Sequence, residues 1–159
     1  MYQESTIPIK SNSISVYIAR KVGDRMQLLL VNRLDATEDD WGVIYTDVKP
    51  MEMCWQAALN QVRLDTSLVP DSVYSVDKVE MFYDVKTHAV MLAPTFLALF
   101  DHGQEVAPLD PDIRVMWLDI EEAIQNLPLA SQREMVKMLH ENYFLKEPCS
   151  KLKVYPTRF

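Results

Sequence analysis

Apolar and polar residues recur with two different periods along the chain, and the change of period separates expected strands from expected helices. Six stretches rich in β-branched and aromatic residues predict strands. These expected strands cover 13–20, 25–33, 41–45, 73–85, 88–101 and 115–120. Gly23 lies in a turn between the first two, which predicts an antiparallel pair. The turn around Lys86 and Thr87 joins the two longest strands into a hairpin.

Helical spacing appears in three places. After Pro50, the residues Trp55, Ala58, Leu59 and Val62 recur at the spacing of one helix face, and the polar stretch 66–72 ends that helix. Two more helices are expected near the C-terminus, at 119–127 and 129–144.

Capping signals mark the starts of both C-terminal helices. Asp119 is the expected N-cap of the first, and the acidic residues that follow it suit the helix dipole. Ser131 is the expected N-cap of the second, with Glu134 three residues later completing a capping box. The whole pattern predicts an α+β sandwich, with strands inside and helices outside one core.

Length and composition fit one domain, because 159 residues with 48% apolar side chains can bury a substantial core. We expect an N-terminal extension over 1–12, a folded domain over 13–145 and a basic C-terminal tail over 146–159. The net charge of −7 argues against binding a nucleic-acid polymer. The sequence has no apolar run of about 18 residues and no secretory signal, so a cytoplasmic protein without a membrane partner is expected.

A series of segments carries a family resemblance along the chain: NSISVYIAR, LLLVNR, Trp41, WQAAL, VEMFYD, LAPTFLALF, WLDIEEAIQNL and SQREMVKMLHENYF. These segments resemble the Nudix hydrolase superfamily, including its branch of dATP and dihydroneopterin triphosphate pyrophosphohydrolases. The resemblance implies an α/β/α sandwich, with a mixed β-sheet, a central motif helix and C-terminal helices. It also implies pyrophosphate hydrolysis with Mg²⁺ or Mn²⁺, if the chain is active.

The diagnostic motif of that family is degenerate in this chain. The family motif can be aligned with this chain without a gap. The changed positions are then Thr46 for the first glycine, Asn60 for an arginine, Gln61 for a glutamate, Leu64 and Asp65 for a glutamate pair, and Ser67 for the second glycine. Glu52, Val62 and Leu68 are kept. The resemblance makes Glu52, Gln61 and Asp65 the candidate catalytic positions, and Glu52 and Asp65 the metal ligands of an active enzyme.

Positions 61, 64 and 65 project from one helix face, where the family's glutamates would hold Mg²⁺. Only one carboxylate remains there, and the amide Gln61 cannot take up a proton. A general base contributes roughly 10²–10⁴ in rate. We therefore expect hydrolysis to be lost or strongly reduced, and a chain without this activity would need no cofactor. The alternative is an active pyrophosphohydrolase with a rearranged metal site.

Other changes in the motif affect its backbone and its first carboxylate. A β-branched residue disfavours positive φ, so Tyr45 and Thr46 predict that the loop has an ordinary conformation, and the same change is expected at Ser67. Glu52 is expected to lose its partner, because Asn60 replaces the arginine.

Aromatic side chains near the motif could stack a nucleobase. The candidates are Trp41, Tyr45, Phe82 and Tyr83, for which core packing is the alternative. A relocated metal site could draw on Asp39, Asp40, Glu80, Asp84, Asp110 or Asp112, although surface charge is the alternative for each. The expected partner is a nucleotide-like small molecule, and a homodimer stays open.

Overall fold

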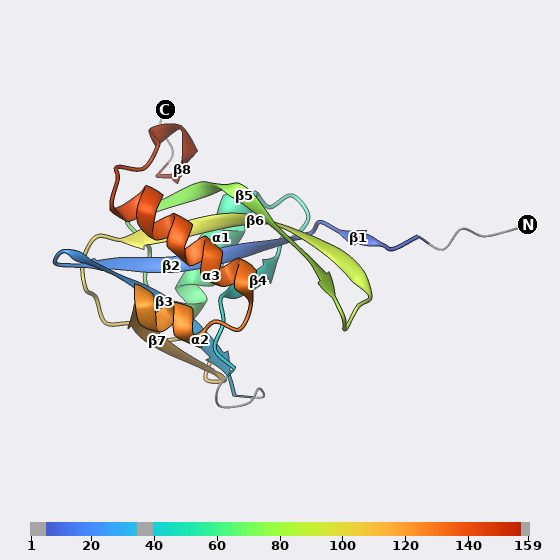
Figure 1. The fold of residues 1–159 in the computed structure, drawn as a ribbon, viewed down its shortest axis with the longest axis horizontal. Coiled ribbons are helices and arrows are strands. Elements are labelled where there is room, and N and C mark those ends of the chain that lie inside the picture. The colour runs from blue at the N-terminus through green and yellow to red at the C-terminus, as the bar shows by residue number, and fades with distance from the viewer. Residues whose placement is uncertain (1–5, 35–39, 157–159) are drawn as a thin grey trace, which may run out of the picture.

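The computed structural model describes residues 6–34 and 40–156 as one mixed sheet between two helical layers (Figure 1). Its strands are β1 (Ile9–Lys10), β2 (Ser13–Val22), β3 (Arg25–Arg33), β4 (Ile44–Asp47), β5 (Ser72–Asp84), β6 (Ala89–Phe100), β7 (Ile113–Asp119) and β8 (Lys153–Tyr155). Its helices are α1 (Cys54–Thr66), α2 (Ile120–Asn126) and α3 (Ala130–Leu139), which continues into a π-helical turn (His140–Phe144). A short 3-10 helix (Ser150–Leu152) precedes β8.

The main path of the sheet runs in the order β7-β3-β2-β6-β5-β8. β2 is antiparallel to β3 and parallel to β6, so the sheet is mixed, as the resemblance implied. β4 pairs with the first half of β2, and β1 pairs in parallel with β6. The hairpin predicted around Lys86 and Thr87 is confirmed as the β5–β6 connection.

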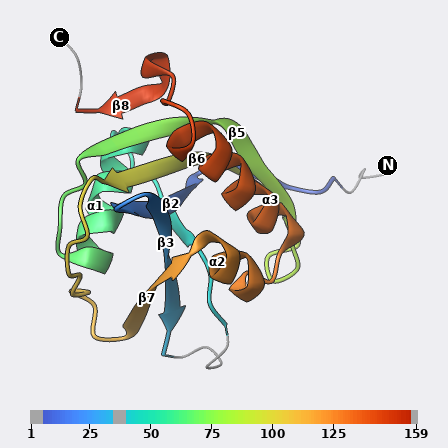
Figure 2. The same ribbon diagram turned by 60° about the vertical axis from the view of Figure 1, so that its left-hand side comes forward.

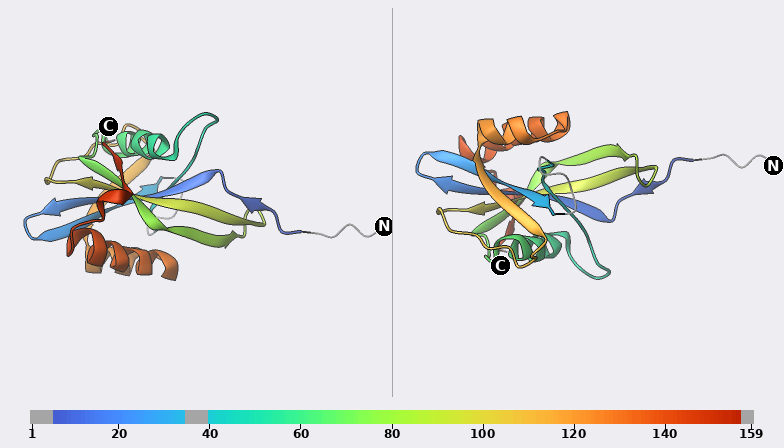
Figure 3. Two further views of the ribbon diagram at one scale, coloured as in Figure 1. Left: turned by 90° about the horizontal axis from the view of Figure 1, so that it is seen from above. Right: turned by 90° about the horizontal axis from the view of Figure 1, so that it is seen from below.

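Helices cover both faces of the sheet, α1 on one and α2 with α3 on the other (Figures 2 and 3). Alternation along β2 explains this, since successive side chains point to opposite faces. Ile14, Val16 and Ile18 pack in the cluster that contains Ala58 and Val62 of α1. Tyr17 and Ala19 pack in the cluster that contains Met135, Val136 and Leu139 of α3. The predicted α+β sandwich is confirmed.

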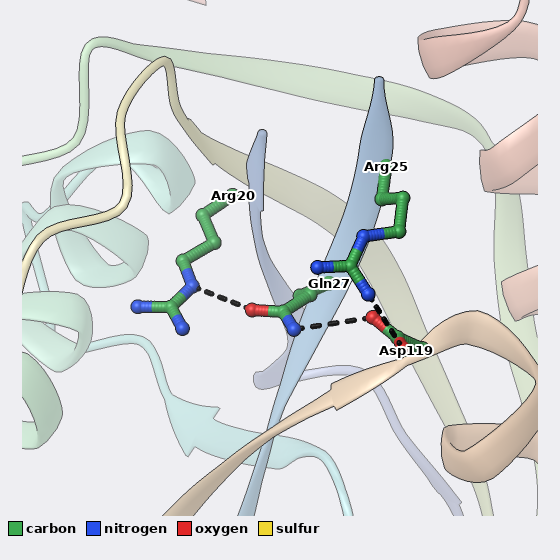
Figure 4. A network of polar contacts seen from close by, with 4 residues as sticks. All are labelled: Arg20, Arg25, Gln27 and Asp119. Atoms are coloured by element: carbon green, nitrogen blue, oxygen red, sulfur yellow. Dashed lines mark hydrogen bonds and ion pairs between the residues drawn. The ribbon is translucent and has the colours of Figure 1, made fainter. Parts of the chain in front are cut away.

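One of the two expected helix caps is confirmed. Asp119 is the N-cap of α2, although its carboxylate makes no capping bond. It accepts instead from Gln27 Nε2 at 3.1 Å and from Arg25 Nη1 at 3.3 Å (Figure 4). The capping box of Ser131 and Glu134 is wrong, because α3 begins at Ala130 and its N-cap is Leu129.

The bounds of most expected strands shift by one or two residues, and the largest shift is in β4. The strand expected at 41–45 covers Ile44–Asp47, and Gly42 forms only an isolated bridge with Val31.

The far part of the β5–β6 hairpin, residues 79–94, is called here the hairpin arm. It extends past both helical layers, together with β1 (Figures 1 and 3). No helix in the described ranges has the length and apolar character needed to span a bilayer.

Candidate functional site

Positions 61, 64 and 65 of α1 form its motif face, and two of these side chains are hydrogen-bonded to each other. Gln61 Nε2 donates to both carboxylate oxygens of Asp65, at 3.3 Å from Oδ1 and 3.2 Å from Oδ2. Asp65 is 1% exposed. Burial raises the pKa of this carboxyl from 3.8 to about 6, although the Gln61 bond and the positive charge of Arg33 act to lower it. Leu64, one position earlier, is exposed.

Two small hollows flank this face, and Gln61 lines both. The first has a volume of about 150 Å³ and is lined by Val31, Arg33, Val43, Ile44, Tyr45, Gln61, Asp65 and Ile113. The second has about 220 Å³ and is lined by Thr46, Asp47, Lys49, Glu52, Ala57, Asn60, Gln61 and Leu64. Asp65 therefore borders one hollow and Glu52 the other, so the two candidate metal ligands do not share a hollow.

Glu52 keeps a partner, contrary to expectation. Asn60 Nδ2 donates to Glu52 Oε2 at 3.0 Å, and the backbone N–H of Lys49 donates to Oε1 at 3.1 Å. An asparagine amide thus reaches the carboxylate from the position where the family motif has an arginine. The bond is retained, but the positive charge is not.

The two replaced glycine positions behave differently. Tyr45 and Thr46 lie in β4, paired with Ser15 and Ile14, and neither has a positive φ, so the expected ordinary backbone is confirmed at these two positions. Further along the same loop it is not, because Met51 has a φ of 68°. The same expectation for Ser67 is wrong: its φ is 62°, and its N–H donates to the carbonyl of Arg63 as the left-handed C-cap of α1. The Ser67 hydroxyl donates to the carbonyl oxygen of Ala107, which helps to hold this conformation.

A buried carboxylate that the sequence did not single out as a structural centre lies under α3. Glu80 accepts from Tyr17 Oη at 2.5 Å and from the hydroxyl of Tyr45, and is itself buried. Gln132 Nε2 of α3 donates to Tyr45 Oη at 3.3 Å. Burial, followed by the charge of Glu80, raises the pKa of both tyrosines. The only signal of this cluster in the sequence was that Glu80 stands between apolar neighbours on an expected strand.

The four candidate aromatic residues do not form one group. Tyr45 and Phe82 meet edge to face, with ring centroids 5.8 Å apart. Tyr83 points to the opposite face of β5, is exposed, and lies 3.2 Å from His88 Nδ1 through its hydroxyl. Trp41 is partly buried against the core cluster beneath α3. Tyr45 and Phe82 therefore come together, and Tyr83 lies apart from them.

The remaining acidic candidates are scattered. Asp110 and Asp112 line a hollow of about 420 Å³ with Arg33 and Leu34. Asp84 holds the hairpin turn by accepting from Thr87 Oγ1 at 2.7 Å. Asp40 is exposed, and Asp39 lies outside the described residues. Arg33 was missed by the sequence argument, although a charged residue at the end of the apolar strand 25–33 was available as a signal.

The donor set on α1 does not fit Mg²⁺, which requires near-octahedral oxygen ligation. Both oxygens of Asp65 accept from an amide, Leu64 offers no donor atom, and Glu52 borders a different hollow. Across residues 6–34 and 40–156, no three or more His, Cys, Asp or Glu side chains are grouped as a metal ion would require.

Comparison with known proteins gives a match in structure but none in sequence. No family model and no curated protein sequence matches the chain. A binary complex of the C. elegans Ap4A hydrolase superposes with a TM-score of 0.67 at 16% identity, over 81% of this chain and 94% of that one.

Two other solved structures are similar to the same degree. The NUDIX domain of Shewanella oneidensis NrtR, complexed with ADP ribose, gives a TM-score of 0.65 at 16% identity, over 88% of this chain and 92% of that chain. The E. coli dihydroneopterin triphosphate pyrophosphohydrolase gives 0.66 at 18% identity, over 84% and 97%. With its mixed sheet between α1 and the α2–α3 layer, the chain has the fold of the Nudix hydrolases.

Proposed function

We propose that this Nudix-fold protein binds a nucleotide-like ligand and has lost most or all pyrophosphohydrolase activity. The observation that supports the proposal best is the bond from Gln61 to both oxygens of Asp65. Asp65 is the one carboxylate among positions 61, 64 and 65, and both of its oxygens accept from an amide. A similar fold with bound ADP ribose supports the ligand class.

The hollow beside Asp65 supplies chemistry for an anionic ligand. Arg33 lines it, and a guanidinium can donate two parallel hydrogen bonds to a phosphate. Arg33 also lines the adjoining hollow with Asp110 and Asp112. We expect Arg33 to contact a phosphate group, with Tyr45 and Gln61 as neighbouring contacts in the same hollow.

A hydrolysis assay tests the loss of activity. The purified chain is incubated with nucleoside triphosphates, ADP ribose and Ap4A, each with Mg²⁺ or Mn²⁺, and the released products are quantified. We expect turnover at least ~10⁴-fold below the common enzymatic range of about 1–10³ s⁻¹. Turnover inside that range, abolished by Asp65→Ala, would overturn the proposal.

A binding assay tests the retained ligand site separately. Calorimetric titration with the same compounds compares the parent with Arg33→Gln, and Arg63→Gln serves as the matched control, because Arg63 lies on α1 but lines neither hollow. Loss of the phosphate contact should weaken binding about tenfold or more. Equal affinities of the two variants would remove Arg33 from the site, and no binding of any compound would contradict the ligand class.

One observation favours a second candidate, an active hydrolase with a rearranged metal site. Besides burial, the charge of Asp110 acts to raise the pKa of Asp65, and Arg33 lines a hollow with each of these two carboxylates. In this alternative Asp65, Glu52 and a relocated acid such as Asp110 would bind Mg²⁺ or Mn²⁺. Metal-dependent turnover that disappears in Asp110→Asn would support it, and turnover unaffected by that change would exclude Asp110.

A further inference from the structure

The outer edge of β5 is unpaired along the hairpin arm. On its inner side β5 pairs with β6 through to Asp84, opposite Ala89. On its outer side β8 pairs only at Val73 and Tyr74, so no described strand meets the edge beyond them. An extended edge leaves backbone N–H and C=O groups available to another strand.

The two faces of this edge strand differ sharply. Glu80 and Phe82 point toward Tyr17 and Tyr45 and belong to the body of the protein. Val79, Met81 and Tyr83 point the other way and are 57%, 69% and 51% exposed. The exposed face of β5 in the arm is therefore apolar.

Apolar residues of the neighbouring strands extend this surface. Residues directly opposite each other on paired strands share a face. Leu92 lies opposite Met81, Val90 lies opposite Tyr83, and Ile9 of β1 lies beside Val90. An apolar surface of this extent next to an open strand edge is a feature of interaction sites.

We propose that two copies of the chain pair through the outer edges of β5, antiparallel, about a two-fold axis at Met81. A two-fold interface uses one surface twice, and a strand paired antiparallel with its own copy meets this condition. The two exposed apolar faces come together on one side of a continuous sheet only if odd-numbered residues lie opposite odd-numbered ones.

Charge distinguishes the three central axes that keep this condition. β5 pairs regularly with β6 from Val79 to Asp84, after a register shift between Ser75 and Val79. Within this stretch, an axis at Met81 places Val79 opposite Tyr83 and Glu80 opposite Phe82 of the second copy. An axis at Glu80 would place that carboxylate opposite its own copy, and an axis at Phe82 would place Glu80 opposite Asp84. Like charges directly opposite each other destabilise a strand pair, so the Met81 axis is favoured over the other two.

Disulfide trapping tests the register in a full-length background carrying Cys54→Ala and Cys149→Ser. At the axis, two copies of Met81→Cys have Cα atoms about 5 Å apart, within the range of a disulfide. The Cα atoms of the two Val79→Cys positions lie about 14 Å apart, because four residues along the strand separate them, and the same holds for the two Tyr83→Cys positions. We expect covalent dimer from Met81→Cys, none from either other variant alone, and dimer from the two mixed.

Light scattering over a concentration series tests the association itself. The parent should form a dimer, Met81→Lys should be monomeric because two ammonium groups meet at the axis, and Leu109→Lys should remain dimeric. Leu109 is the control because it is 62% exposed and lies outside the arm. A parent that stays monomeric up to about 100 µM, a dimer that persists in Met81→Lys, or equal cross-linking of all three single cysteines would each overturn the proposal. These measurements involve no ligand and no hydrolysis, so they are independent of the proposed function.

Discussion

The side-chain amide of Gln61 lies 3.3 Å and 3.2 Å from the two carboxylate oxygens of Asp65, one turn further along α1. This contact provides hydrogen-bond donors to a carboxylate that is buried on the helix face. The amide supplies donors to both oxygens, and Arg33 adds a positive charge nearby, but neither cancels the effect of burial on the Asp65 pKa. A buried carboxylate of this kind is expected to make stability depend on pH.

We expect Asp65→Asn to stabilise the protein relative to the parent increasingly between about pH 4 and pH 7. The folded protein binds the Asp65 proton more tightly than the unfolded chain, because the pKa rises from 3.8 to about 6 on folding. The stabilising contribution is complete below the unfolded pKa and is lost as pH rises through about 6. The rise corresponds to roughly 3 kcal/mol, and an uncharged amide does not lose this energy.

Urea unfolding of both proteins at several pH values measures the effect. The quantity of interest is the free energy of unfolding of the variant minus that of the parent. A difference that does not change with pH would show that Asp65 titrates alike in the folded and unfolded chains.

We expect Tyr45→Phe to lower the free energy of unfolding by about 1–3 kcal/mol, because a buried carboxylate loses a donor. Among the described residues, Glu80 would keep only the hydroxyl of Tyr17 as a side-chain donor, and Gln132 would lose its acceptor on Tyr45. Tyr83→Phe is the matched control, since that hydroxyl is on an exposed residue and touches only His88 at 3.2 Å among the contacts described. It should change stability by less than about 0.5 kcal/mol. Equal effects in chemical denaturation would contradict the structural role of Glu80.

The strands and the layers could be predicted from the sequence because their signals are local. Alternation along 13–20 assigns Ile14 and Tyr17 to opposite faces, and two helical patterns supply a cover for each face. The N-cap of α3 could not be identified, since Ser131 and Glu134 satisfy a local rule that the chain does not use. Leu127 is buried in the core, and Arg133 Nη1 donates to its carbonyl at 2.9 Å, so tertiary contacts help fix where the helix begins.

In the candidate site too, features with a local sequence signal could be predicted, and features that depend on distant segments could not. The single surviving carboxylate at 61, 64 and 65 was evident from spacing, and its closure by Gln61 follows from the i, i+4 relation. The Glu80 cluster was not predictable, because Tyr17, Tyr45 and Gln132 come from three distant segments. Loss of the arginine predicts a lost ion pair, but the Asn60 amide still has a donor that reaches Glu52.

We expect Ser67→Gly to be more stable than Ser67→Ala by about 1 kcal/mol, because φ here is 62° and only glycine adopts it without steric strain. Both changes remove the hydroxyl that donates to Ala107, so their difference isolates the backbone conformation. Thermal and chemical unfolding of the two variants give the comparison. If the alanine variant were as stable, the left-handed C-cap would not be the strained element.

We expect Gln61→Glu to destabilise the protein by about 1–3 kcal/mol at neutral pH without metal, and millimolar Mn²⁺ to reverse the loss. The change replaces an amide donor by a second carboxylate next to Asp65, where like charges repel and a divalent cation can bridge them. The parent should show no stabilisation by Mn²⁺, because Asp65, the single carboxylate of its motif face, accepts from the Gln61 amide. Binding at 100 times the dissociation constant adds about 2.7 kcal/mol, which thermal unfolding resolves easily.

Gln56→Glu provides the matched control for this prediction. Gln56 is an exposed glutamine in the same helix, so the control also replaces an amide by a carboxylate in α1. Gln56 accepts from the Met53 N–H, which a glutamate can also do. Its stability should not respond to Mn²⁺. If the parent were stabilised by Mn²⁺ as strongly as Gln61→Glu, the motif face would already bind a cation, and the active hydrolase with a rearranged site would become the better account of this fold.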